Sequence, residues 1–430
     1  MSHARDRKPR IQQIAAAVIG NALEWYDFVI FGFMLVVLSR LFFPASSEHA
    51  SLLLATATFG AGFVMRPLGG LLIGMYADRH GRKAALQLIM ALMTVAMLMI
   101  SLAPTYAAIG IAAPLVIVTA RLLQGFATGG EFSSATAFLL EMAPARQRGF
   151  YTSWQMFGQG LALLFGASIG ALMTHILAAE AIDAWGWRIP FLLGLLIGPV
   201  GFWIRSHLDE TTAFLAASKA PPEKRSLACL LRKHWCQVAI VMGLTTFGTV
   251  AFYVLIIFMP IFAHLTLKLA LADAFLAQVI AIAFMTLLMP LFGWLSDRVG
   301  RKPILLAAAL VVLLAIYPLT LWLTTAPSFA KLLSTQLILC GAVGAYFGPI
   351  SAALAEQFPA GLRSTGLAIG YNGAVVLFGG FAPFTVTWLS RAIGETVAPF
   401  LYVLIATIIG LIAAIFVVDR TPDTILPVVD

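Results

Sequence analysis

Long apolar stretches alternate with short polar segments along nearly the whole chain. Twelve stretches are long enough to cross a lipid bilayer, which takes about 20 residues of α-helix. We expect helices near residues 12–38, 52–77, 84–104, 112–140, 149–175, 187–205, 236–263, 274–296, 303–324, 332–357, 364–390 and 397–419. The pattern predicts an all-α membrane protein with twelve spans in two six-helix bundles, residues 1–205 and 236–430, joined by a polar linker at 206–235.

Composition supports a membrane location. Hydrophobic residues make up 61% of the 430 residues and charged residues 11%, against about 25% charged in an average soluble domain. The net charge of +8 raises nucleic-acid binding as an alternative. However, twenty of the 27 Lys and Arg fall in the two termini and the even-numbered loops, five in the odd-numbered loops and two within spans. This asymmetry predicts that both termini are cytoplasmic and argues against a nucleic-acid partner.

Two polar motifs occur once in each half of the chain. Residues 74–83, GMYADRHGRK, recur as residues 293–302, GWLSDRVGRK. Glu141, Pro144 and Arg148 recur as Glu356, Pro359 and Arg363, with identical internal spacing and almost the same offset. Repeats at matching places indicate a duplicated bundle, the plan of many two-halved transporters.

The repeated loops contain our candidates for gating. These are Asp78, Arg79, Arg82, Asp297, Arg298 and Arg301. We expect Asp78 to pair with an arginine or with a helix N-terminus and so to hold the outward-facing state closed on the cytoplasmic side. The alternative is a solvated turn that is basic only because of the membrane topology.

Five ionisable residues lie well inside the expected spans, all in the first half. They are Glu24, Asp27, Arg66, Arg121 and Glu131. A charge near the bilayer centre costs at least about 2.5–3.5 kcal/mol, so such residues are functional candidates. The alternative is a buried ion-pair network that only holds the helices in register. Three acids against two bases leave an imbalance, which favours protonation of one carboxyl group.

The spacing of these residues predicts a polar helix face. Arg121, Gln124, Thr128 and Glu131 follow steps of three and four along the expected helix 112–140, so Arg121 and Glu131 would stand about 15 Å apart along it. Well inside its spans, the second half offers only neutral hydrogen-bonding groups, among them Tyr371 and Asn372.

The residues argue against a metal site or an enzyme. None of the seven histidines lies well inside a span, and the three cysteines have no metal-ligand spacing. We therefore expect no cofactor. A membrane-embedded enzyme or a sensor stays open as a remote alternative.

Several longer motifs resemble a known family. Besides the two repeated loops, they are GNALEWYDF at 20–28, RPLG at 66–69, RLLQG at 121–125, Glu131, WQ at 154–155 and WGWRIPF at 185–191. The chain resembles the major facilitator superfamily and, within it, the metabolite–proton symporters, over essentially its whole length. FFPA at 42–45 and SLLL at 51–54 are most similar to the citrate and tricarballylate branch.

The resemblance implies a monomeric symporter of the bacterial inner membrane that uses H⁺ to import a small organic acid anion. Citrate or tricarballylate fits it best; α-ketoglutarate or another dicarboxylate, shikimate, and betaine or proline stay open. On this basis we expect carboxylate binding by arginine, whose planar fork offers paired donors. The substrate-binding candidates are Asn21, Arg66, Arg121, Gln124, Tyr371 and Asn372.

The coupling proton is assigned to an acid inside a span. The candidates are Glu24, Asp27 and Glu131, and we rank the last two above Glu24. Arg66 has an alternative role, because it directly precedes Pro67 late in the second span and would there pin the cytoplasmic gate.

Overall fold

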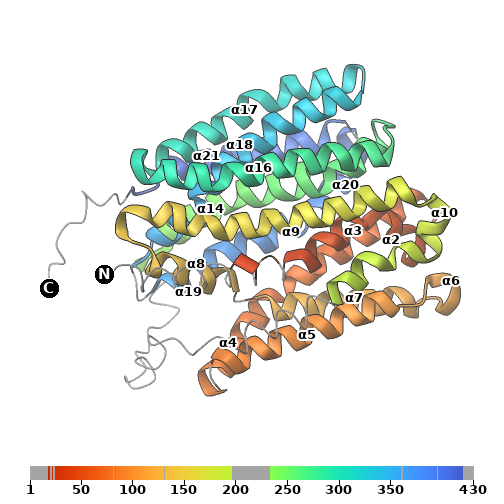
Figure 1. Ribbon diagram of the computed structural model, residues 1–430, viewed down its shortest axis with the longest axis horizontal. Coiled ribbons are helices and arrows are strands. Elements are labelled where there is room, and N and C mark those ends of the chain that lie inside the picture. The colour runs from red at the N-terminus through yellow and green to blue at the C-terminus, as the bar shows by residue number, and fades with distance from the viewer. Residues whose placement is uncertain are drawn as a thin grey trace, which may run out of the picture.

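Helices make up all of the regular structure that the computed structural model describes (Figure 1). It describes residues 18–19, 22, 25–80, 82–129, 131–195, 233–359, 362–394 and 396–419. We call residues 25–195 the first segment and residues 233–419 the second segment. The long helices of both segments run side by side, nearly parallel to the long axis of the molecule (Figure 1).

The first segment begins with the helical stretch Trp25–Phe33. Its further helices are α2 (Leu35–Phe42), α3 (Glu48–Val64), α4 (Arg66–His80), α5 (Arg82–Leu102), α6 (Tyr106–Ile109), α7 (Ala112–Ala127), α8 (Glu131–Met142), the 3₁₀ turn η1 (Ala145–Gln147), α9 (Arg148–Ile176), α10 (Ala179–Ala181) and the π-helical turn η2 (Ile182–Gly186). Residues 188–195 are also helical.

The second segment contains longer helices. They are α14 (Trp235–Ala251), the π-helical η3 (Phe252–Phe258), α15 (Met259–Leu265), α16 (Leu271–Val299), α17 (Arg301–Thr325), α18 (Phe329–Glu356), α19 (Arg363–Ala374), the π-helical η5 (Val375–Gly379), α20 (Ala382–Ile393) and α21 (Ala398–Ile415).

Within the described ranges, eight helical runs are long and apolar enough to cross a membrane, or nine if the bent pair Trp25–Phe33 and Leu35–Phe42 is one span. Two shorter apolar helices, Gln87–Leu102 and Ala112–Ala127, accompany them. These runs match the apolar stretches of the sequence. The expected linker at 206–235 lies outside the described residues, apart from its last three positions.

Three spans that the apolar pattern predicts as regular helices are irregular. The first span bends by 69° at Met34, and the fourth ends as α7 at Ala127 and resumes as α8 at Glu131. In the second, α3 and α4 are separated only by Met65, within the apolar run Glu48–Ile73. The predicted polar face on one helix from Arg121 to Glu131 is therefore wrong, because the two residues lie on different helices. Apolar periodicity does not register such breaks, since both helices on either side remain hydrophobic.

Glycines bring the second and fourth spans into backbone contact. A Cβ atom on Gly62 would lie 2.8 Å from the carbonyl oxygen of Arg121, and one on Gly125 would collide with the carbonyl oxygen of Gly62. Further along, a Cβ on Gly129 would collide with the carbonyl oxygen of Arg66. Small residues allow such close approach between membrane helices. The contact fixes α3 and α4 against α7 on both sides of Arg66 and Arg121.

The two segments pack against each other along α9 and α16, which lie side by side (Figure 1). Small residues form this contact: a Cβ on Gly149 would lie 2.5 Å from the carbonyl oxygen of Gly293, and one on Gly293 would lie 2.6 Å from Cβ of Ser153. Because these side chains are small or absent, α9 and α16 can approach each other closely.

Substitution of Gly125 tests the backbone contact. We expect Gly125→Ala to lower the free energy of unfolding by about 1–3 kcal/mol, because the new methyl group must displace the backbone at Gly62. Thermal unfolding of the purified protein in detergent measures this. Gly373→Ala is the control: its Cβ would meet only Met242 atoms at 3.6 and 3.8 Å, so stability should be kept or rise. Equal stability of both variants would contradict the assigned contact.

Candidate functional site

Arg121 lies in the interior of the first segment. Its side chain is fully buried on α7, and Nη1 donates a hydrogen bond to Oε1 of Gln124 at 2.8 Å. Three phenylalanine rings surround the guanidinium, with ring centroids 4.6–5.0 Å from Cζ: Phe28, Phe31 and Phe59. Aromatic faces attract cations and offset part of the cost of burying them.

Arg66 contacts one of the same rings. Its Cζ lies 4.9 Å from the centroid of Phe28 and 4.3 Å from that of Phe63, and the side chain is 4% exposed. Because both guanidinium groups contact Phe28, the structure brings the two arginines together, as the assignment of both to one site requires. We call Arg66 and Arg121 the arginine pair.

The arginine pair retains unused hydrogen-bonding capacity. Nε of each guanidinium has no hydrogen-bond partner in the described part of the chain. No salt bridge to either arginine forms among the described residues. An arginine fork with a free Nε–H can still donate to a carboxylate.

Of the described acids, Asp27 lies near the arginine pair. It is 5% exposed and lies within electrostatic range of Arg121. On its other side it approaches the helical residues 188–195, because a Cβ on Gly194 would lie 3.2 Å from its Oδ1. Asp27 therefore connects the arginine pair with the end of the first segment.

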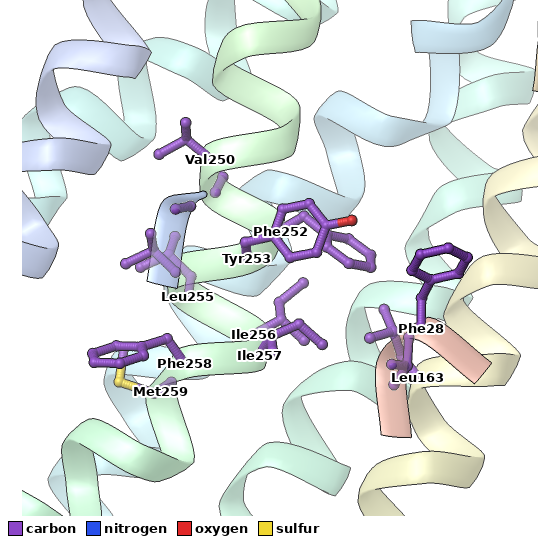
Figure 2. Close-up of a cluster of buried hydrophobic side chains, with 14 of the residues drawn as sticks. Phe28, Leu163, Val250, Phe252, Tyr253, Leu255, Ile256, Ile257, Phe258 and Met259 are labelled. Carbon is purple, nitrogen blue, oxygen red and sulfur yellow. The ribbon is translucent and has the colours of Figure 1, made fainter. Parts of the chain in front are cut away.

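The second segment contributes aromatic hydroxyl groups to the same region. Tyr253 on η3 contacts Phe59 and Phe63 edge-to-face, with centroids 5.6 Å apart in both pairs. Figure 2 shows Tyr253 with its hydroxyl directed away from its own helix, in the cluster of buried apolar side chains that also contains Phe28. Tyr253 and Tyr371 both lie within electrostatic range of Arg66.

Tyr371 and Asn372 join the segments directly. The ring of Tyr371 stacks on Phe132 of α8, with centroids 3.7 Å apart and planes 4° from parallel. Asn372 donates from Nδ2 to the carbonyl oxygen of Gly129 at 3.0 Å. Both partners lie at the break of the fourth span, beyond Arg121.

On the other side of the arginine pair, Phe33 contacts Phe275 edge-to-face, with ring centroids 5.7 Å apart. Contacts between the segments therefore lie on both sides of the pair.

A charged cluster closes the end of the molecule where α16 meets α17. Oδ1 and Oδ2 of Asp297 accept hydrogen bonds from the backbone N–H groups of Gly149 and Phe150, at 2.8 and 2.9 Å, at the start of α9. Nη1 of Arg301 donates to Asp297 at 2.8 Å, and its Nη2 lies 3.5 Å from Oε1 of Glu356. The sequence predicts this pairing for Asp78, whose side chain lies outside the described residues. In the second copy of the motif, Asp297 pairs with the N-terminus of α9 and with Arg301.

Of the remaining candidates, the structure describes the side chain of Arg298 alone. Arg298 is exposed and stacks on Trp294, at 3.8 Å from the ring centroid, so it stands apart from this cluster. Asn21 and Glu24 lie outside the described residues, as do the side chains of Asp78, Arg79, Arg82 and Glu131.

We compared the sequence with protein-family models and with known proteins. The family model described as Major Facilitator Superfamily matches residues 17–369 and 276–428. The chain belongs to the Major Facilitator Superfamily. It is similar to the citrate-proton symporter of Klebsiella pneumoniae, 38% identical over 96% of this chain and 93% of the relative. It is also similar to the alpha-ketoglutarate permease of Escherichia coli (strain K12), 33% identical over 95% and 94%.

Comparison with a solved structure supports the all-helical major facilitator fold. The crystal structure of D-xylose-proton symporter matches with a TM-score of 0.75 and covers 94% of this chain and 96% of that chain, at 22% sequence identity. The expected all-helical major facilitator fold is confirmed.

Sequence reasoning missed the aromatic surroundings of the arginine pair in this major facilitator protein. The signal was present as Phe28 with Phe31 and as Phe59 with Phe63, at helical spacing in spans that also carry site candidates. However, phenylalanine is common in apolar spans, and only the fold shows which rings face the guanidinium groups.

Asp297 has a measurable structural role. We expect Asp297→Asn to lower the free energy of unfolding by about 1–2 kcal/mol, because the start of α9 loses a charged acceptor and Arg301 loses one counter-ion. Thermal unfolding in detergent checks it. Asp273→Asn, an exposed position in the first turn of the same helix α16, is the matched control and should have little effect. A loss at Asp273 equal to that at Asp297 would contradict the assigned role.

Proposed function

We propose that this protein is a proton-coupled symporter that imports a small organic acid, citrate or a related tricarboxylate such as tricarballylate, by alternating access. One observation carries the proposal: two buried guanidinium groups contact the same Phe28 ring, and Nε–H of each has no acceptor among the described residues. Fixed cations of this kind favour an anion with at least two carboxylates. The similarity to a citrate-proton symporter over most of both chains supports the choice of substrate.

The proposal includes a topology. Twelve spans in two bundles, residues 1–205 and 236–430, joined by a linker at 206–235, would cross the bacterial inner membrane as a monomer with both termini in the cytoplasm. The distribution of Lys and Arg supports this orientation. Asp297, Arg301 and Glu356 then close the cytoplasmic side, and Asp78, Arg79 and Arg82 form the corresponding gate in the first bundle. Arg298 lies at the edge of this gate.

The roles of the site residues follow from charge. Arg66 and Arg121 bind carboxylates, and Asn21, Gln124, Tyr371 and Asn372 supply neutral hydrogen bonds. Asp27 and Glu131, and after them Glu24, are assigned to the coupling proton. Protonation of an acid near the arginine pair removes negative charge close to the bound anion, so proton and substrate favour each other's binding. No metal, cofactor or nucleic acid takes part, and the protein is not an enzyme.

A dicarboxylate such as α-ketoglutarate is the second candidate. It also offers two carboxylates to two guanidinium groups, and the similarity to an alpha-ketoglutarate permease favours it over shikimate, proline or betaine. Uptake by proteoliposomes distinguishes these acids. With an acidic outside and an alkaline lumen, we expect accumulation of labelled citrate above equilibrium that a protonophore abolishes. Uptake unaffected by the pH gradient would contradict proton coupling, and uptake of α-ketoglutarate but not citrate would establish the second candidate.

Substitution of Arg121 tests charge recognition. Removing the guanidinium leaves the bound carboxylate without charge-assisted hydrogen bonds, so Arg121→Gln should cost roughly 2–5 kcal/mol, at least about tenfold in affinity. Arg121→Lys should fail nearly as badly, because an ammonium group cannot reproduce the planar fork. The exposed Arg391→Gln is the control and should bind citrate normally.

A double variant separates substrate binding from charge balance at Arg121. If Arg121 only neutralises a buried acid, Arg121→Gln combined with Glu131→Gln should recover the citrate binding that the single variant loses. Recovery would overturn the substrate assignment. Continued loss in a protein that unfolds at a normal temperature supports it.

Neutral substitution of the acids tests coupling. We expect Asp27→Asn or Glu131→Gln to abolish accumulation of citrate against a gradient while exchange of external for internal citrate continues, because exchange moves substrate without net proton transfer. Counterflow in proteoliposomes measures the exchange. Loss of both activities in one variant would move that residue to the substrate site.

A further inference from the structure

Tyr253 presents a buried hydroxyl group to the arginine pair. The side chain is 2% exposed, and its hydroxyl has no hydrogen-bond partner within the described part of the chain. It lies within electrostatic range of both Arg66 and Arg121. A buried hydroxyl without a partner loses the free energy of its hydration, so most such groups in folded proteins are paired. This one is an exception at the centre of the candidate site.

Packing fixes the position of the ring. Phe59 and Phe63 contact it edge-to-face from the first segment. From the second segment, Gly379 of η5 makes room for it, because a Cβ there would lie 3.1 Å from Cε2 of Tyr253. Two π-helical turns, η3 and η5, therefore meet at this tyrosine, and such turns are frequent at functional sites. Figure 2 shows the hydroxyl directed away from the helix that carries it.

Tyr346 on α18 offers a contrast within the same segment. It is fully buried as well, but its hydroxyl donates to the carbonyl oxygen of Leu244 at 2.9 Å. The second segment thus satisfies a buried tyrosine where it serves packing alone. At Tyr253 the fold provides similar burial and ring contacts, but no described residue accepts a hydrogen bond from its hydroxyl.

We propose that the Tyr253 hydroxyl donates a hydrogen bond to a substrate carboxylate held by Arg66 and Arg121, and so acts as a specificity-determining residue from the second segment. This inference rests on the proposed function. Two nearby cations attract the oxygen lone pairs of the phenol, which leaves its hydrogen directed toward an anion. One carboxylate then receives donors from both segments, so that the bound anion links them.

Two tyrosine-to-phenylalanine variants of the full-length protein test the proposal. Both keep the ring contacts and remove one hydroxyl. For Tyr253→Phe we expect an unchanged or higher unfolding temperature without ligand, and a citrate Kd raised on the order of tenfold or more by calorimetry. For Tyr346→Phe we expect the reverse: a lower unfolding temperature, because the oxygen of Leu244 loses its donor, and an unchanged Kd.

The outcomes separate the inference from the proposed function. If Tyr253→Phe binds citrate as tightly as the natural protein, the Tyr253 assignment is overturned and the proposed function stands. If Tyr253→Phe unfolds at a clearly lower temperature without ligand, the hydroxyl has a structural partner and the assignment is overturned as well. If the natural protein does not bind citrate, the proposed substrate fails, and the assignment fails with it.

Discussion

Two guanidinium groups enclosed by apolar side chains set the central constraint on this molecule. Transfer of an ion from water into a protein interior costs several kcal/mol even after relaxation. Phenylalanine faces around Arg66 and Arg121 offset part of this cost, at about 2 kcal/mol or more per desolvated contact. Gly62 and Gly125 bring the helices that carry the two arginines into backbone contact, and both side chains are buried. Among the described residues, Nε of each guanidinium has no acceptor and neither arginine forms a salt bridge.

The missing acceptors link recognition of the substrate to movement of the two segments. A carboxylate at the arginine pair would complete the hydrogen bonding of both guanidinium groups and of Tyr253, which belong to different segments. Contacts between the segments lie on both sides of the pair: Phe33 with Phe275 on one side, and the charged cluster at Asp297 on the other. In alternating access, these two sets of contacts would open in turn while the anion stays bound between them.

Sequence patterns predicted the all-helical fold and its repeated motifs, because long apolar stretches and repeated polar loops can be recognised in the sequence itself. The same patterns placed Arg66 and Arg121 in one site, since a charge within a span is rarely incidental. They failed at the break between α7 and α8, where Gly129 lies against the backbone at Arg66. They also could not select Tyr253 from the other hydroxyl groups of the second half, because its lack of an acceptor is a property of three-dimensional packing.

A structure determined with citrate bound tests the central claim most directly. The account predicts citrate between the two segments, with carboxylate oxygens within about 3 Å of both the Arg66 and the Arg121 guanidinium groups, as charge-assisted hydrogen bonds require. Citrate bound elsewhere, or an arginine pair neutralised entirely by acidic side chains while citrate is bound, would contradict it.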